Sequence, residues 1–155
     1  MSMRLIKRAL YDHLASMPAG LIEVAWDGIR KSASQRNLND DASVQAPYIR
    51  ADFLPAQTPQ SGQEIGDDAP VREVGNVQFT ALYDISAGPG AAQQTADHIT
   101  ARFKWRQTLR AVDDQDASKW ASVRIVTASQ GRLTPDEGWL TIPVTVRWTA
   151  IRSGD

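Results

Sequence analysis

The segment "DISAGPGAAQQTADHI", residues 84–99, has the layout of a phosphate-binding loop, because a glycine-rich turn joins an alternating apolar run to a helix-like segment. A Walker-type loop also needs a lysine at the helix start, but residues 93–95 are Gln-Gln-Thr. A dinucleotide-binding loop needs a third glycine where Gln93 stands, and Pro89 removes one backbone donor. The sequence therefore predicts a structural turn at residues 88–90 that reverses the chain into a helix.

The two histidines do not form a recognisable metal or catalytic cluster. His13 lies beside the apolar face of the first expected helix, a position typical of a packed, partly buried histidine. His98 follows Asp97, but neighbouring residues on a helix do not face each other. Because His98 also lies off the apolar face of its helix, we expect it in solvent or at an interface. A zinc site would need carboxylates from distant segments, and no spacing in the sequence indicates one.

The clustered carboxylates do not match a known ion-binding loop either. In "DDQDASK" (113–119), a calcium loop counted from Asp114 would need glycine where Lys119 stands and glutamate where Ile125 stands. The adjacent pair at 67–68 could bind a divalent ion at a subunit contact, although a solvated acidic loop is the simpler interpretation. No G-x-S-x-G, S-x-x-K or H-E-x-x-H pattern is present. We therefore expect neither an enzyme nor a bound cofactor.

Composition indicates one ordinary globular domain over residues 1–155, because 42% of the residues are hydrophobic and 23% are charged. The net charge of −1 does not favour specific binding to nucleic acid or to an anionic membrane. No apolar run approaches the ~18 residues that a membrane span needs. The absence of cysteine excludes disulfides and thiolate metal sites.

Charge is unevenly distributed along the chain. The net charge is +3 over residues 1–36, −5 over 37–75 and +1 over 76–155. This pattern suggests a protein that binds copies of itself or other proteins, although a solvated acidic loop explains the acidic middle equally well. The candidate interface residues from these regions are Arg4, Lys7, Arg8, Glu64, Asp67 and Asp68.

Apolar spacing predicts two helices and five strands. Apolar residues recur at three- and four-residue steps from Met3 to Met17, which indicates a helix that stops at Pro18, and a second helix follows Gly90. Alternation predicts strands over 21–26, 47–55, 76–85, 121–128 and 139–148. The remaining connections include a polar loop at 55–75, a turn region within 106–120 and a turn at 131–138.

The element order α-β-β-β-α-β-β predicts an α+β fold, with two helices packed on one face of a mostly antiparallel or mixed sheet. The strands at 47–55 and 76–85 are expected to pair as a hairpin whose arm is the acidic loop at 55–75. Pro143 lies within the last strand, which predicts an edge position or a local bulge.

Five tryptophans are the remaining feature that could mark a functional surface. Trp148 lies on the apolar face of the last strand and is expected in the core. Trp139 lies on the opposite face, and Trp105 follows the second helix, so both are candidates for contact surfaces. Aromatic anchors are enriched where partners pack, although these two side chains could equally cover the edges of a small core.

Taken in order, these segments resemble the tail terminator, or tail completion, proteins of long-tailed bacteriophages of the lambda-like type. An N-terminal helix leads into a strand ending in "VAWDG" (24–28), and "PYIRADFLP" (47–55) follows. The segment "GNVQFTALYDISAGPGAAQQTADHITARF" (75–103) then gives a strand, a Gly/Pro turn and a helix of the form A…AD.I…F. The chain closes on "GWLTIPVTVRW" (138–148), which is similar to the family's final strand.

The resemblance implies a ring-forming structural protein, usually a hexamer, that needs no catalytic residue. Such a ring caps the growing tail tube, stops its polymerisation and presents a surface to the head-side connector. The implied partners are copies of the chain, the major tail tube protein and the connector. The implied location is the head-proximal end of the tail in the virion, after assembly in the bacterial cytoplasm.

A closed ring joins two different patches of each subunit, and the basic first helix and the acidic region at 37–75 are our candidate pair. Docking on the last tube ring is a second candidate role for the loop at 55–75. Three alternatives remain open at the level of sequence: a head-completion or neck protein, a small nucleotide- or metal-dependent enzyme using Asp97 or His98, and a monomeric binding module.

Overall fold

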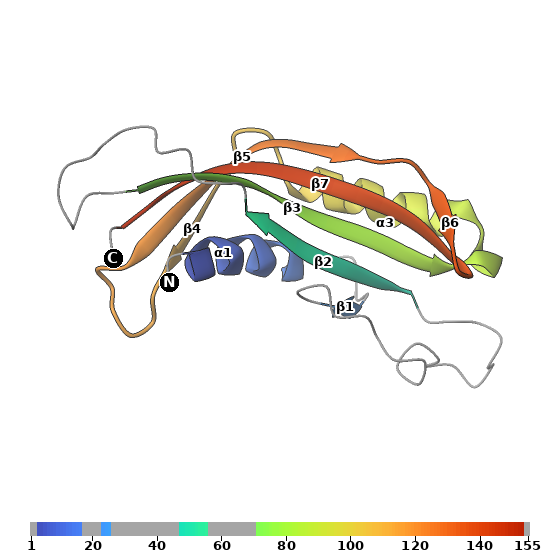
Figure 1. The fold of residues 1–155 in the computed structure, drawn as a ribbon, viewed down its shortest axis with the longest axis horizontal. Coiled ribbons are helices and arrows are strands. Elements are labelled where there is room, and N and C mark those ends of the chain that lie inside the picture. The colour runs from blue at the N-terminus through green and yellow to red at the C-terminus, as the bar shows by residue number, and fades with distance from the viewer. Residues whose placement is uncertain (1–2, 17–22, 26–46, 56–70, 154–155) are drawn as a thin grey trace.

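The structure is a computed structural model of the 155-residue chain, and it describes residues 3–16, 23–25, 47–55 and 71–153. In these residues, seven strands form one sheet in the order β1-β2-β3-β7-β5-β4, with β6 paired to β7 beyond the end of β5. The elements are α1 (Met3–Ala15), β1 (Glu23–Ala25), β2 (Tyr48–Pro55), β3 (Val71–Asp84), the 3-10 turn η2 (Ile85–Ala87), α3 (Pro89–Arg102), β4 (Thr108–Val112), β5 (Trp120–Gln130), β6 (Thr134–Asp136) and β7 (Trp139–Arg152) (Figure 1).

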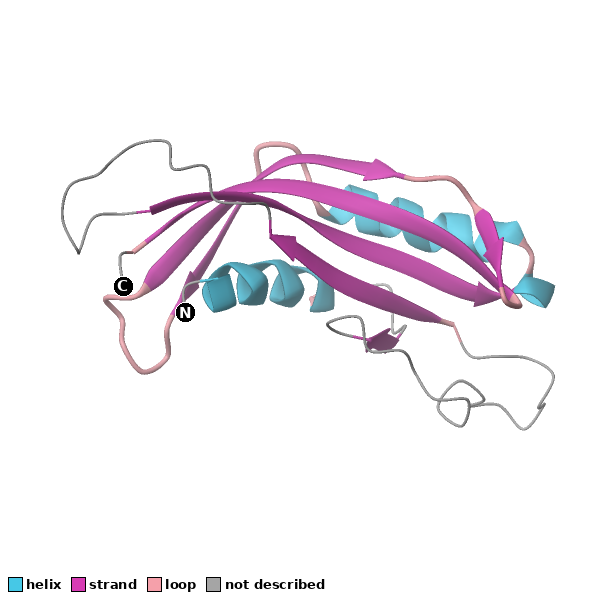
Figure 2. Ribbon diagram, viewed as in Figure 1, coloured by secondary structure: helices cyan, strands magenta, loops and turns pink. Residues whose placement is uncertain are grey.

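The predicted α+β class is confirmed. The sheet is strongly curved, and both helices pack against the same face of it (Figure 2). Only β1 and β2 run parallel among the pairings of the described strands, and the other pairings are antiparallel. The expected hairpin of the second and third strands is also confirmed, because β2 pairs with β3 from Tyr48–Leu82 to Pro55–Gly75. Residues 56–70 of the hairpin's arm lie outside the described residues.

Alternation along the central strands builds the core. On the helix-facing side of β7 the buried residues are Ile142, Val144, Val146, Trp148 and Ala150, and they share one cluster with the buried face of α1. The helix face expected at Ala92, Ala96, Ile99 and Phe103 is confirmed, since all four residues are buried in that cluster. The two alanines add little width, which lets the α3 backbone lie close to the sheet.

The Gly88-Pro89-Gly90 segment is a chain reversal into a helix, as the sequence predicts. Gly88 has φ 79° and ψ 166°, a conformation that side chains rarely adopt, and Pro89 is the first residue of α3. The preceding turn η2 is held by Asp84, whose Oδ1 accepts hydrogen bonds from the backbone and hydroxyl of Ser86 at 2.9 and 2.6 Å.

Several elements differ from the sequence expectations, among them β7, which continues to Arg152. Residues 108–112 form strand β4 instead of a turn region, and Leu109 and Ala111 face the core. β3 begins at Val71 and so takes the last residues of the expected loop at 55–75. Residues 134–136 form the short strand β6 inside the expected turn.

The expected edge position of Pro143 is wrong for the strand as a whole, because β7 lies between β3 and β5. Locally, however, the Pro143 carbonyl accepts a hydrogen bond from the backbone N–H of Gly131 at 2.6 Å, in the gap between β5 and β6. The nitrogen and the carbonyl of a strand residue point the same way, so the missing N–H also faces this gap. The proline therefore removes no ladder bond to β3.

Candidate interaction surfaces

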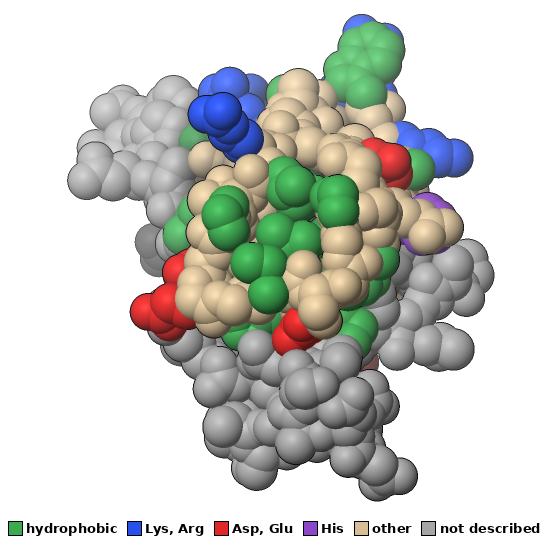
Figure 3. Space-filling model, turned by 90° about the vertical axis from the view of Figure 1, so that its right-hand side faces the viewer, with side chains coloured by type: hydrophobic (Ala, Val, Ile, Leu, Met, Phe, Trp, Pro, Cys, Tyr) green, Lys and Arg blue, Asp and Glu red, His purple; other side chains and the backbone are tan. Residues whose placement is uncertain are grey.

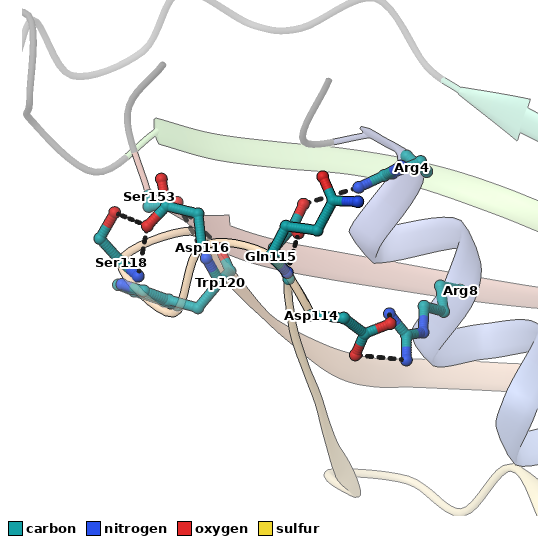
Figure 4. Close-up of polar contacts among 9 residues, drawn as sticks. Arg4, Arg8, Asp114, Gln115, Asp116, Ser118, Trp120 and Ser153 are labelled. Carbon is teal, nitrogen blue, oxygen red and sulfur yellow. Dashed lines mark hydrogen bonds and ion pairs between the residues drawn. The ribbon is translucent and has the colours of Figure 1, made fainter.

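Two arginines of α1 bind the loop between β4 and β5. Arg4 Nη2 lies 2.6 Å from Asp113 Oδ2, and both Nη atoms of Arg8 donate to the Asp114 carboxylate at 3.0 and 3.2 Å (Figure 4). Arg8 also lies 3.6 Å from Asp12, one helical turn further along. Residues four apart share one helix face, which is why both arginines reach the same loop.

Two carboxylates of this loop, those of Asp113 and Asp116, accept hydrogen bonds from within the loop itself. Asp113 accepts from the backbone of Gln115 at 2.9 Å, and this bond, together with the charge of Arg4, lowers the pKa of the carboxyl group. Asp116 accepts from the hydroxyl and backbone of Ser118 at 2.6 and 3.0 Å, which lowers the pKa of Asp116 (Figure 4). No group of three or more metal-ligating side chains lies together in the described part of the chain. The loop anchors α1, because Asp113 and Asp114 bind Arg4 and Arg8.

The expected contact joins the basic helix of one subunit to an acidic segment of a neighbour, and only the helix lies in the described residues. Arg4 and Arg8 already have carboxylate partners in their own chain, and the ammonium of Lys7 lies 5.5 Å from the centre of the Tyr11 ring. The acidic candidates, which lie outside the described residues, are Glu64, Asp67 and Asp68. The pairing of these two regions stays a prediction.

Trp105 is an exposed aromatic residue in the turn between α3 and β4. Its side chain is 68% exposed, and the Arg106 guanidinium lies 4.1 Å from the ring centre. Arg106 has a positive φ of 63°, and its N–H donates to the Ile125 carbonyl at 2.9 Å. The turn is thus fixed to β5 while the indole points into solvent. This placement is compatible with a contact surface, and that role stays a prediction.

Trp139, the other candidate, is buried within the chain. It is 5% exposed and meets the Tyr48 ring edge-on, with ring centres 5.3 Å apart. Together with Leu82 these residues form a small cluster on the face of the sheet opposite the helices. Sequence alternation places Trp139 on that face correctly but does not show that Tyr48 covers it.

The two histidines lie as the sequence predicts. His13 is partly buried against the edge of the Phe103 ring, and its Nε2 lies 2.8 Å from the carbonyl oxygen of Arg102. Arg102 in turn donates to the His13 carbonyl at 3.1 Å, so these bonds join the two helices. His98 is exposed on α3. Neither histidine lies in a cluster that could hold a metal among the described residues.

An apolar surface at one end of the sheet was not predicted from the sequence. Figure 3 shows hydrophobic side chains gathered on this end of the molecule, with few charged groups among them. The large exposed hydrophobic residues next to the elements at this end, the end of β3 and β6 (Figure 1), are Ile85, the first residue of η2, and Leu133, just before β6, which are 53% and 36% exposed. The Ile85 N–H donates to the Gly138 carbonyl at 3.0 Å, which ties η2 to the β6–β7 turn. We call this surface the apolar end.

None of the helices in the described residues is long and apolar enough to cross a membrane. A family model described as "Phage tail terminator protein" matches residues 5–148 of the chain. No curated protein matches the chain. Among the solved structures that match, one has 24% sequence identity and a TM-score of 0.61 and covers 100% of this chain and 97% of its own. That likeness shows a shared fold.

Proposed function

The chain belongs to the phage tail terminator family and is thus a phage tail protein, and from this premise we propose that it forms a ring that caps the tail tube. The ring, a hexamer by the resemblance described above, ends tube polymerisation and offers its other side to the head-side connector. The observation that carries the proposal is the family match over residues 5–148, which spans both helices and most of the sheet. The protein acts through contacts and not through catalysis.

Two unlike ends of the subunit support a role between two partners. The apolar end carries Ile85 and Leu133 and is poor in charge, which suits a large permanent contact with the tube (Figure 3). The other end carries the ionic anchor of α1, in which Arg4 and Arg8 meet Asp113 and Asp114 (Figure 4). A cap needs such a difference, because its two sides bind different proteins.

The proposal is tested first by imaging the purified protein by negative stain and then by adding it to polymerising tube protein. Closed rings that hold the tubes short would support the proposed cap. A chain that remains monomeric at every concentration would contradict the ring. Rings that bind the connector but leave tube length unchanged would instead indicate a neck protein.

The apolar end can be tested separately with the paired substitution Ile85→Asp and Leu133→Asp. Both side chains are exposed, so the variant should fold and form rings but lose the ability to stop tube growth. A matched control is Val112→Asp, because Val112 is a similarly exposed apolar residue (39%) on the edge strand β4. Equal tube-capping activity of the double variant and wild type would exclude the apolar end as the tube contact.

A further inference from the structure

The face of the sheet that points away from the helices carries a group of arginines near the β4 edge. Along β3, β7, β5 and β4, the residues that alternate with core residues form this outer face. Its exposed basic residues, which we call the arginine face, are Arg72, Arg110, Arg124 and Arg147. They come from four different strands, so only the folded sheet brings them together.

The strand register fixes their positions in neighbouring rows. Ile151 of β7 lies between Arg72 and Ser122, and Ser122 in turn pairs with Arg110. In the next row, Arg124 pairs with Thr108 on one side and with Thr149 on the other. Between these rows the surface is hollowed by about 310 Å³, with a lining that includes Arg72, Thr108, Ser122, Arg124, Thr149 and Ile151.

The arginine face has no acidic counterpart among the described residues. No carboxylate occupies an outward position in these rows, and none of the four guanidiniums forms an ion pair with a described residue. Arg110 alone has a neighbour of another kind, the Trp120 ring at 5.9 Å. In contrast, the described arginines that do have carboxylate partners are Arg4, Arg8, Arg50 and Arg152.

The polar groups that line the hollow are two guanidiniums and three hydroxyl groups, beside the apolar Ile151, so the hollow offers positive charge and hydrogen-bond donors but no negative charge to what enters it. Guanidinium groups bind carboxylates in a two-pronged geometry, and hydroxyl groups can donate to the remaining oxygens. The matching anion for a chain that assembles with itself is a cluster of Asp and Glu side chains. The sequence supplies one, since Glu64, Asp67 and Asp68 are three carboxylates within five residues.

We propose that the arginine face of one subunit binds the acidic segment 64–68 of a second copy of this chain. The inference rests on the proposed ring and names the surfaces that close it, with Arg72 and Arg124 as the central contacts. It replaces the basic helix α1 as the partner of the acidic segment, because Arg4 and Arg8 are already paired within their chain. The overall charge of −1 lets copies approach without strong repulsion, while the separated charges fix their relative orientation.

The experiment uses two charge-reversed forms of the full chain. One carries Arg72→Glu with Arg124→Glu, and the other carries Asp67→Lys with Asp68→Lys. Each alone should lose rings at low salt, as measured by light scattering after size-exclusion chromatography, because like charges then meet at every contact. Mixing the two should restore rings with alternating subunits, since each contact again joins opposite charges. The matched control is Lys119→Glu with Arg132→Glu, an equal change of charge at exposed residues that do not line the hollow.

The possible outcomes separate this inference from the proposed function. If both reversed variants form rings as wild type does, the arginine-face contact is overturned and the proposed ring is not affected. Mixing the two variants could fail to restore rings, while a chain that carries all four changes does form them. That result would show that the segment binds the arginine face of its own subunit, and it would overturn the second-copy contact. A wild type that forms no ring would contradict the proposed function itself. Duplex DNA binding that the Arg72/Arg124 variant loses, with rings unaffected, would assign the face to nucleic acid instead.

Discussion

Gly75 of β3 lies directly against the indole of Trp148 of β7, its register partner. A side-chain carbon at position 75 would lie 2.5 Å from Cζ2 of Trp148, closer than such atoms approach one another. Trp148 is fully buried and stacks on Phe53 of β2, with ring centres 5.7 Å apart and planes inclined by 11°. The missing side chain of Gly75 therefore makes room for the largest residue of the core.

The first prediction concerns this contact. Gly75→Ala should lower the free energy of unfolding by about 1–3 kcal/mol, because the indole must shift within a packed core. Urea denaturation followed by tryptophan fluorescence would measure the change. A variant as stable as wild type would show that the space around Trp148 can expand at no cost.

The turn before α3 gives a second prediction with its own control. Gly88→Ala should cost about 1–3 kcal/mol, because Gly88 has a backbone conformation that side chains rarely adopt, although no atom lies within 4 Å of the added carbon. Gly90→Ala should instead stabilise the protein by about 0.5–1 kcal/mol, since Gly90 lies in the first turn of α3 with open space around it. Thermal unfolding of the pair would separate backbone strain from steric contact. Equal shifts in both variants would contradict this assignment.

The buried ion pair between Glu73 and Arg152 gives the third prediction. Arg152 Nε lies 3.0 Å from Glu73 Oε1, and the two side chains are 13% and 4% exposed. Arg152→Met should destabilise the protein by about 3–5 kcal/mol, because it leaves a buried carboxylate without its guanidinium. The double variant Glu73→Leu with Arg152→Met should recover most of that loss. A double-mutant cycle in urea measures the coupling, and additive effects of the two substitutions would contradict it.

The fourth prediction is a dependence of stability on pH. Hydrogen bonding from Gln115 and the charge of Arg4 lower the pKa of Asp113 in the fold, so the ionised carboxylate stabilises the native state above its unfolded pKa of about 3.9. Asp113→Asn should therefore be less stable than wild type at pH 7. As the pH falls below about 4 and through the lowered pKa, protonation of Asp113 should remove the difference. Unfolding midpoints of both proteins between pH 7 and pH 2 provide the measurement, and a constant gap would exclude the carboxylate as its cause.

Local sequence patterns were sufficient to predict the elements that bury a regular apolar face. The α3 face and the long alternation of β7 were predictable because every second or every third to fourth residue enters the core. β4 was missed because its core-facing residues are only Leu109 and the small Ala111, so its strand form depends on pairing with β5 and contact with α1. The start of β3 was missed because Glu73 faces the core, and its partner Arg152 lies 79 residues further along the chain.

For the candidate surfaces too, the features set by local sequence were predictable and those set by contacts between distant segments were not. The exposed position of Trp105 follows from its place after a helix end, whereas the burial of Trp139 depends on Tyr48 from a distant strand. The partners of Arg4 and Arg8 lie more than 100 residues away in sequence, so no local pattern could identify them. The arginine face is equally hidden, because its four members come from four strands that only the register brings together.

The central position of β7 has a consequence for how the protein is made. Among the strands that the structure describes, β3 and β5 join only through β7, and β7 follows both of them in the chain. At a synthesis rate of roughly 5–20 residues per second, β3 emerges from the ribosome several seconds before residues 139–152 exist to pair with it. During that interval the edge of β3 that later pairs with β7 has no partner, so the growing chain carries a long unpaired strand edge, and such edges are prone to aggregation.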